Sequence, residues 1–245
     1  MDAPQLSFMR HEKKYLLSPQ QYDRLRARLE PHFAADQYGM HTILSLYYDT
    51  PDYALIRRSL ERPVYKEKLR LRAYGVPGPD DRVFVELKKK FDGVVYKRRI
   101  ALPLHLARDC LQGRYRPVDE PTVRELAFFL GRYPLLRPAA LLCYDRVALF
   151  GREDRDLRVT FDRNIRARAV QLDLAKGDWG GPVLPPDRIL MELKLPLGAP
   201  LWLARLLSEE EIFPARFSKY GAYYQEALAP LQAADPARKK VVPCA

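Results

Sequence analysis

Residues 64–74 read VYKEKLRLRAY, and residues 82–90 read RVFVELKKK. The side chains of a β-strand alternate between its two faces. In the first stretch one face carries Lys66, Lys68, Arg70 and Arg72, and the other carries Tyr65, Glu67, Leu69, Leu71 and Ala73. The second stretch divides in the same way, into Glu86, Lys88 and Lys90 against Val83, Val85 and Leu87. The pattern predicts two strands of a sheet that has one apolar face and one cationic face.

The rest of the chain supplies further strands and several amphipathic helices. Strands are expected at 6–17, 40–49, 94–102, 139–150, 157–165 and 188–195, besides the two above. Helices are expected from Ser18, where a capping box begins, near 53–60, and at 104–111, 122–132, 201–211 and 218–228. Gly-Pro and Asp-Gly pairs between strands favour tight turns, and therefore antiparallel neighbours. The absence of repeats and linkers predicts a single domain over residues 1–245.

Composition excludes several classes of protein. The 245 residues include 42 Lys and Arg against 31 Asp and Glu, a net charge of +11, and 47% are hydrophobic, enough for a core. No apolar run approaches the roughly 18 residues of a membrane-spanning helix. Charges near the start argue against a secretory signal, so a cytoplasmic protein is expected. The three Cys and four His show no disulfide or zinc spacing, and no P-loop or dinucleotide-binding motif occurs.

Charge is concentrated on the alternating strand positions. Other residues join those faces: Arg10, Glu12, Lys14, Lys97, Arg99, Arg146, Arg158, Asp162, Glu192 and Lys194. The faces hold 13 basic and 4 acidic residues, while the rest of the chain holds 29 and 27. One such face needs no function, because an antiparallel sheet usually has a solvated side. The whole set fits better an α+β fold in which an antiparallel β-barrel tunnel, with flanking helices, surrounds a chain of phosphates.

Eight short motifs in order resemble a known family. They are RHEKKY from Arg10, RLR from Arg70, VELK from Val85, KRR from Lys97, YDR from Tyr144, LRVTFD from Leu157, MELK from Met191 and FSKY from Phe217. Together they resemble the polyphosphate polymerase domain of the vacuolar transporter chaperone (VTC) family, one of the triphosphate tunnel metalloenzymes. The resemblance runs from about Phe8 to Leu228.

The resemblance implies roles for individual residues. Phosphate contacts are implied for Lys14, Arg70, Arg72, Lys88, Lys97, Arg146 and Arg158, with Ser218 and Lys219 closing one end of the track. Arg10, Arg99 and Lys194 lie on the same charged faces and are expected to add phosphate contacts. Glu192 is implied to bind Mn²⁺ or Mg²⁺, with an ion pair to Lys194 or Arg158 as the alternative. Glu12 and Glu86 either assist the metal or pair with Lys14 and Lys88, and Asp162 is expected to orient Arg158.

Two departures from family patterns bear on function. The tunnel phosphohydrolases of the adenylate cyclase and thiamine triphosphatase branch begin with ExExK, whereas this sequence has Arg10 at the first Glu position. A cation there favours the polymerase branch. The SPX domain and membrane helices of the eukaryotic polymerases are not found, so regulation by inositol phosphates and product export are not implied.

Three functions remain open. Phosphoryl transfer depends on charge neutralisation and alignment, so basic side chains and one metal suffice, and no Ser nucleophile or His base is needed. The first hypothesis is transfer of the γ-phosphoryl of ATP to inorganic polyphosphate, and the second is a metal-dependent triphosphatase acting on inorganic or nucleoside triphosphate. The third is a non-catalytic polyanion-binding module. Specific nucleic-acid binding is not expected, because the cations lie within strands. The adenine site and the oligomeric state stay open.

Overall fold

The computed structural model describes residues 11–92, 94–195 and 198–234. The strands are β1 (His11–Leu17), β2 (Phe33–Ala35), β3 (His41–Asp49), β4 (Tyr65–Tyr74), β5 (Arg82–Phe91), β6 (Val94–Pro103), β7 (Arg137–Gly151), β8 (Arg158–Arg168), β9 (Gly181–Pro182) and β10 (Ile189–Leu195). The α-helices are α1 (Pro19–Leu29), α2 (Ala54–Leu60), α3 (Leu104–Leu111), α4 (Pro121–Arg132), α5 (Leu201–Glu209), α6 (Lys219–Tyr223) and α7 (Ala229–Ala234). A 3₁₀ turn, η1, covers Leu174–Lys176, and a π-helical turn, η2, covers Tyr224–Leu228. No helix in these described ranges is long and apolar enough to cross a membrane.

Ten strands form one large sheet. Eight follow the hydrogen-bonding order β1-β10-β8-β7-β3-β4-β5-β6, while β2 pairs with β7 and β9 pairs with β8. The registered ladders of β1 with β10, β10 with β8, β3 with β4, β4 with β5, and β5 with β6 are all antiparallel. The expected α+β class with an antiparallel sheet is therefore confirmed. Closure of the sheet into a barrel is not confirmed, because the strand order ends at β1 and β6 and no ladder joins these two strands within the described residues.

The chain folds as two compact units, each assembled from three separate segments. Unit 1 comprises Met1–Thr42, Tyr144–Ile165 and Leu184–Phe217, and unit 2 comprises Ile43–Cys143, Arg166–Val183 and Ser218–Ala245. The expected single domain over the whole chain stays a prediction.

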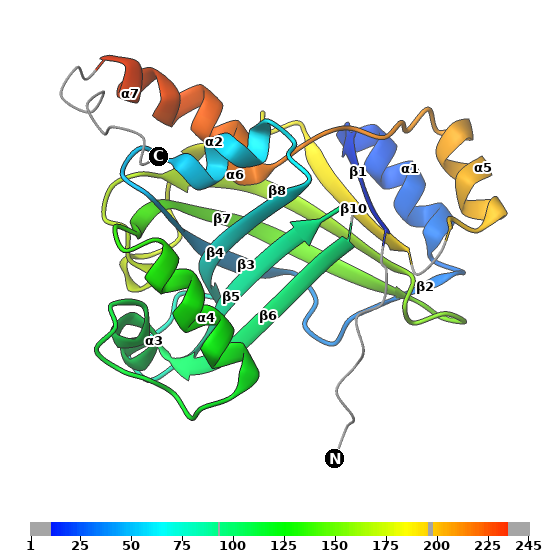
Figure 1. The fold of residues 1–245 in the computed structure, drawn as a ribbon. Helices are drawn as coiled ribbons and strands as arrows, with labels where there is room; N and C mark the ends of the chain where they lie inside the picture. Colours follow the sequence, from blue (N-terminus) through cyan, green and yellow to red (C-terminus); the bar gives the residue numbers. More distant parts are fainter. Residues whose placement is uncertain (1–10, 93, 196–197, 235–245) are drawn as a thin grey trace. The chain divides into compact units, whose positions relative to one another are not determined.

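In unit 1, the odd-numbered residues of three neighbouring strands are buried beneath two helices. Tyr15 of β1, Phe161 of β8 and Met191 of β10 pack with Leu25 and Leu29 of α1 and with leucines of α5. Figure 1 shows α1 and α5 together beside β1. Ser18 starts α1 with the expected capping box: its Oγ accepts from Gln21 N–H at 3.2 Å, and Gln21 Oε1 accepts from Ser18 N–H at 3.0 Å. The even-numbered residues of these strands therefore point to the opposite face.

In unit 2, the apolar face of the β4–β5–β6 sheet is also covered by helices. Leu69, Leu71, Val85 and Leu87 are at most 2% exposed and pack with residues of α3 and α4 such as Ala107 and Phe129. Figure 1 shows α4 beside β5 and β6, with α3 next to α4. The cationic residues Lys68, Arg70, Lys88 and Lys97 occupy the other face, as the alternation predicted.

The observed boundaries agree closely with most of the expected elements. The part of the first strand before residue 11 lies outside the described residues. Helix α5 ends at Glu209, two residues early, and Glu211 has φ +53°, which is incompatible with a continuing right-handed helix. The expected helix at 218–228 is instead α6 followed by η2, and α7 continues to Ala234. The short strands β2 and β9 were not expected, because segments of two or three residues carry no readable alternation.

Candidate functional site

Glu86 lies at the centre of a cluster of cations in unit 2. Its side chain is 1% exposed. Strand register places Arg70 of β4 and Arg99 of β6 directly opposite Glu86 on either side. Glu86 Oε2 accepts from Arg70 Nε at 2.7 Å, and Glu86 Oε1 accepts from Arg99 Nε at 2.9 Å and from Lys97 Nζ at 2.7 Å. Arg72 Nε lies 3.6 Å from Glu86 Oε2. One buried carboxylate therefore orients four cationic side chains.

The cluster has an excess of positive charge, which lowers the pKa values of Glu86 and Lys97. Burial opposes ionisation of Glu86, but Arg70, Arg72 and Lys97 outweigh it and hold the pKa of Glu86 well below its usual value. Desolvation lowers the pKa of Lys97 to about 8, with further lowering by Arg70 and Arg72, although Glu86 opposes the shift. The Lys97 side chain is still 43% exposed, so water moderates this effect. The cluster is therefore an environment that favours an added anion.

Other residues of unit 2 extend this cluster. Lys88 lies opposite Lys68 on one side and Lys97 on the other, and the described residues offer it no acidic partner within ion-pair distance. Lys68 Nζ lies 3.5 Å from Ser218 Oγ. Ser218 is the N-cap of α6, where its Oγ accepts from Gly221 N–H at 3.2 Å, and Lys219 follows as the first helical residue. Seven of the predicted phosphate-binding positions thus lie in this one unit: Arg70, Arg72, Lys88, Lys97, Arg99, Ser218 and Lys219.

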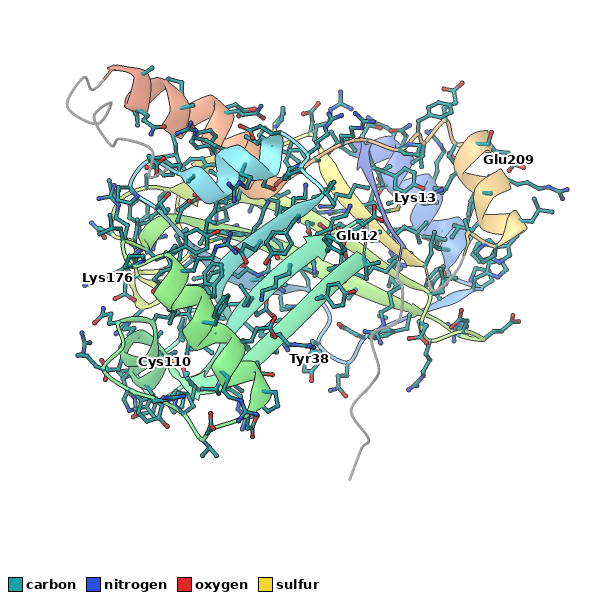
Figure 2. All side chains as sticks on the ribbon, viewed as in Figure 1. Glu12, Lys13, Tyr38, Cys110, Lys176 and Glu209 are labelled. Carbon is teal, nitrogen blue, oxygen red and sulfur yellow. The ribbon has the colours of Figure 1, made fainter. Side chains whose placement is uncertain are left out.

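Unit 1 holds a second polar cluster, centred on Glu192 of β10. Arg146 of β7 donates to both oxygens of Asp162, at 2.6 and 2.7 Å, and to Glu192 Oε2 at 3.1 Å. Lys14 of β1 lies opposite Glu192 in register, and its Nζ is 3.6 Å from Glu192 Oε1 and 3.3 Å from Glu12 Oε1. Lys14 Nζ also donates to the carbonyl of Phe217 at 3.2 Å. Figure 2 shows Glu12 extending from β1.

The oxygen atoms around Glu192 suit a hard divalent cation. Thr160 lies directly opposite Glu192 in the β10–β8 ladder. It is 5% exposed, and its Oγ1 has no hydrogen-bond partner among the described residues. Mg²⁺ and Mn²⁺ favour oxygen ligands, and Mg²⁺ commonly binds through one or two carboxylates plus substrate phosphates. The described residues contain no group of three or more His, Cys, Asp or Glu arranged to hold a metal alone. The site therefore fits a cation held jointly by Glu192 and a phosphate ligand.

Several contacts differ from those expected from sequence. The ion pair of Glu12 with Lys14 is present. The pairing of Glu86 with Lys88 was wrong: its partners come from β4 and β6, because cross-strand neighbours lie closer than residues two apart on one strand. The contact expected between Asp162 and Arg158 is replaced, in the contacts described, by the bidentate pair with Arg146. The contacts described for Glu192 are with Arg146 and Lys14, and they include neither Lys194 nor Arg158.

Two expected phosphate ligands in unit 1 lie beside the second cluster, and one cannot be placed. Lys194 pairs in register with Glu12 and with Arg158, on the face that also carries Glu192. Arg158 Nε donates to the carbonyl of Arg155 at 3.3 Å. Arg10 lies outside the described residues.

Sequence reasoning missed the polar face of β3. Ser45, Tyr47 and Asp49 alternate with Leu44, Leu46 and Tyr48, which are buried in the core. Register places Ser45 opposite Arg72 and Tyr47 opposite Arg70. Asp49 is completely buried and accepts from the N–H groups of Leu55 and Ile56 at the start of α2. The alternation of residues 44–49 is readable in the sequence, but Ser45 and Tyr47 carry no charge and Asp49 is a single acid, so this face gives no charge pattern.

Comparison with known proteins agrees with this geometry. No curated protein matches the chain. A putative adenylate cyclase from Bacillus halodurans has 15% identity and a TM-score of 0.52, with 84% of this chain and 92% of that one covered. A putative adenylyl cyclase from Hippeastrum, which reveals a dominant triphosphatase activity, has 17% identity and a TM-score of 0.52, with 90% of this chain and 98% of that chain covered. These similarities show a shared fold. The model of the VTC domain matches residues 9–227, which confirms the resemblance seen in the motifs, and the chain belongs to the VTC domain family.

Proposed function

We propose that this protein is a metal-dependent phosphotransferase that moves the γ-phosphoryl group of ATP onto a growing chain of inorganic polyphosphate. Membership of the VTC family makes it an enzyme of the triphosphate tunnel type, polymerase or triphosphatase. We infer in addition that it is a polymerase, that ATP is the donor and that a basic tunnel surrounds the polyphosphate.

The observation that carries the proposal is the set of cations around Glu86. Arg70, Arg72, Lys97 and Arg99 surround a single carboxylate, and Lys88 adds a further charge beside them. Concentrated positive charge is costly unless an anion offsets it. Guanidinium groups bind phosphate oxygens in pairs and keep their charge at any physiological pH. A chain of phosphates is the ligand that matches this arrangement.

The chemistry requires little beyond positioning. A terminal oxygen of the polyphosphate forms a bond to the γ-phosphorus of ATP, the bond from that phosphorus to its β–γ bridging oxygen breaks, and ADP leaves. A phosphate oxygen is already anionic, so no side chain has to activate the nucleophile. In unit 2, Arg70, Arg72, Lys88 and Lys97 would hold phosphate oxygens. In unit 1, Lys14, Arg146 and Arg158 would hold phosphate oxygens. A bound Mg²⁺ or Mn²⁺, held by Glu192 with Thr160 beside it, would neutralise developing charge on the phosphates.

The alternative is hydrolysis of inorganic or nucleoside triphosphate by the same residues. Arg10, which replaces the first acid of the hydrolase pattern, favours the polymerase. The decisive experiment is incubation of the purified protein with ATP and Mn²⁺, followed by separation of ADP, free phosphate and polyphosphate. Polymerase activity gives ADP in step with phosphate in chains that an exopolyphosphatase digests. Release of free phosphate alone would establish the triphosphatase, and binding without turnover would leave a polyanion-binding module.

A further inference from the structure

Tyr47 of β3 contacts Arg70, one of the cations expected to bind phosphate. Arg70 NH1 donates to the Tyr47 hydroxyl at 3.3 Å, while Arg70 Nε donates to Glu86 Oε2 at 2.7 Å. The two contacts come from strands on opposite sides of β4. Hydrogen bonds to residues of both β3 and β5 fix the plane of the Arg70 guanidinium, and a bidentate phosphate contact requires such a fixed plane.

The Tyr47 ring is held in place by a second chain of contacts. It stacks on the ring of Tyr220 in α6, with centroids 4.7 Å apart and planes at 23°. Tyr220 is 2% exposed and donates its hydroxyl to Asp49 Oδ2 at 3.0 Å. Asp49 in turn accepts from Leu55 N–H at 2.9 Å, at the start of α2. Tyr47 is thus anchored by buried groups on β3, α2 and α6, and α6 begins with Ser218 and Lys219.

The charges around Tyr47 are mainly positive. Lys68, Arg70 and Arg72 of β4 face it, together with Tyr220 of α6, Asp49 of its own strand, and Glu86 beyond Arg70. Burial would raise the pKa of Tyr47, but the three cations outweigh burial and lower it to about 8. In contrast, burial raises the pKa of its neighbour Tyr48 to about 12. Tyr47 therefore responds electrostatically to whatever occupies the cluster.

We propose that Tyr47 is a positioning residue of the phosphate-binding cluster: its hydroxyl fixes the Arg70 guanidinium, and its stack on Tyr220 links Arg70 to the helix that begins with Ser218 and Lys219. The inference rests on the proposed function, because it takes the cluster to bind phosphates. Loss of the single 3.3 Å hydrogen bond from the Arg70 guanidinium to the Tyr47 hydroxyl removes one of the two contacts that fix the guanidinium plane. The consequence is weaker binding of a triphosphate without loss of the fold.

The test compares Tyr47→Phe with Tyr48→Phe by calorimetric titration with tripolyphosphate at pH 7. Tyr47→Phe keeps the stacked ring and removes only the hydroxyl, and we expect it to weaken binding about fivefold. Tyr48→Phe makes the same change on the opposite face of β3 and is expected to bind like the wild type. Tyr47→Leu, which also removes the stack, should weaken binding further.

The ultraviolet absorption of tyrosinate gives a readout that a purely structural role would not change. The wild type should show one tyrosine that ionises near pH 8, and Tyr47→Phe should lack it. Tripolyphosphate should move this ionisation to higher pH, because a nearby anion disfavours a second negative charge. Unchanged affinity in Tyr47→Phe together with a wild-type titration that tripolyphosphate does not shift would overturn the inference. If the wild type itself binds no tripolyphosphate, the proposed function is refuted as well. If the wild type binds tripolyphosphate and elongates polyphosphate while Tyr47→Phe gives the refuting results above, only the role of Tyr47 is refuted.

Discussion

Replacing Glu86 by glutamine should destabilise the protein in a way that an added polyphosphate repairs. The substitution keeps the shape of the side chain and removes the one negative charge shared by Arg70, Arg72, Lys97 and Arg99. Those cations would then repel one another across the β4–β5–β6 sheet, with no carboxylate to offset them. Phosphate groups that bind the same cations would supply the missing charge.

The magnitude follows from burial. Removing one partner of a buried ion pair costs about 3–5 kcal/mol. The Glu86 side chain is 1% exposed, but those of Arg70, Arg99 and Lys97 are 20%, 36% and 43% exposed and retain water. We therefore expect the lower end of that range, about 3 kcal/mol. At about 2–4 °C per kcal/mol for a chain of this length, the melting temperature should fall by about 9 °C.

The assay is thermal unfolding with and without tripolyphosphate, and Glu125→Gln is the matched control. Glu125 of α4 contacts Lys89 Nζ at 2.8 Å and Arg98 Nε at 2.9 Å, from the same strands but on their other face, and its side chain is 25% exposed. An ion pair that water can reach contributes about 0–1 kcal/mol, so the control should lose about 4 °C at most, and tripolyphosphate should not stabilise it more than the wild type. Tripolyphosphate should stabilise Glu86→Gln more than the wild type. An equal loss in both variants, or a deficit in Glu86→Gln that tripolyphosphate leaves unchanged, would refute the reasoning.

Three further outcomes are expected. Glu192→Gln should retain the fold, and its metal-dependent turnover, measured as ADP formation, should fall about 10²–10³-fold, because the substitution deletes the charge proposed to hold the cation. Turnover equal to that of the wild type would make Glu192 structural. The double variant Arg70→Ala/Arg72→Ala should weaken tripolyphosphate binding, measured by calorimetry, far more than Arg26→Ala/Arg28→Ala on α1, and equal effects would point to diffuse surface charge. The folded-state pKa of Glu86 is depressed below about 4.5, so its contribution to stability is present above that pH and disappears as acid protonates Glu86 in the folded protein. The free energy of unfolding in urea should therefore depend less on pH below 4.5 for Glu86→Gln than for the wild type.

Strand faces could be read from sequence, whereas contacts between strands could not. The alternation in β4 and β5 correctly separated Leu69 and Val85 from Arg70 and Glu86, because side chains on a strand repeat every second residue. The partners of Glu86 depend on the register of three strands. A sequence does not contain that register explicitly, and the nearest cation along the chain, Lys88, was chosen instead.

The same reasoning explains why the second cluster was only partly anticipated. Glu192 and Lys14 were identified separately, and their proximity follows from a ladder between strands almost 180 residues apart in the chain. Tyr47 was overlooked because it carries no formal charge at neutral pH. Its position opposite Arg70 appears only when β3 is paired with β4.

The interleaving of the two units also governs how the chain can fold during synthesis. Unit 1 needs the segment Leu184–Phe217, and unit 2 needs the segment that begins at Ser218. A nascent chain leaving the ribosome therefore cannot complete unit 1 before residue 217, or unit 2 before the segment that begins at Ser218, has been translated. Pairings between such distant segments close large loops, which slows folding and leaves apolar strand faces exposed in the meantime. The early strands of each unit therefore depend on segments translated much later to cover their apolar faces.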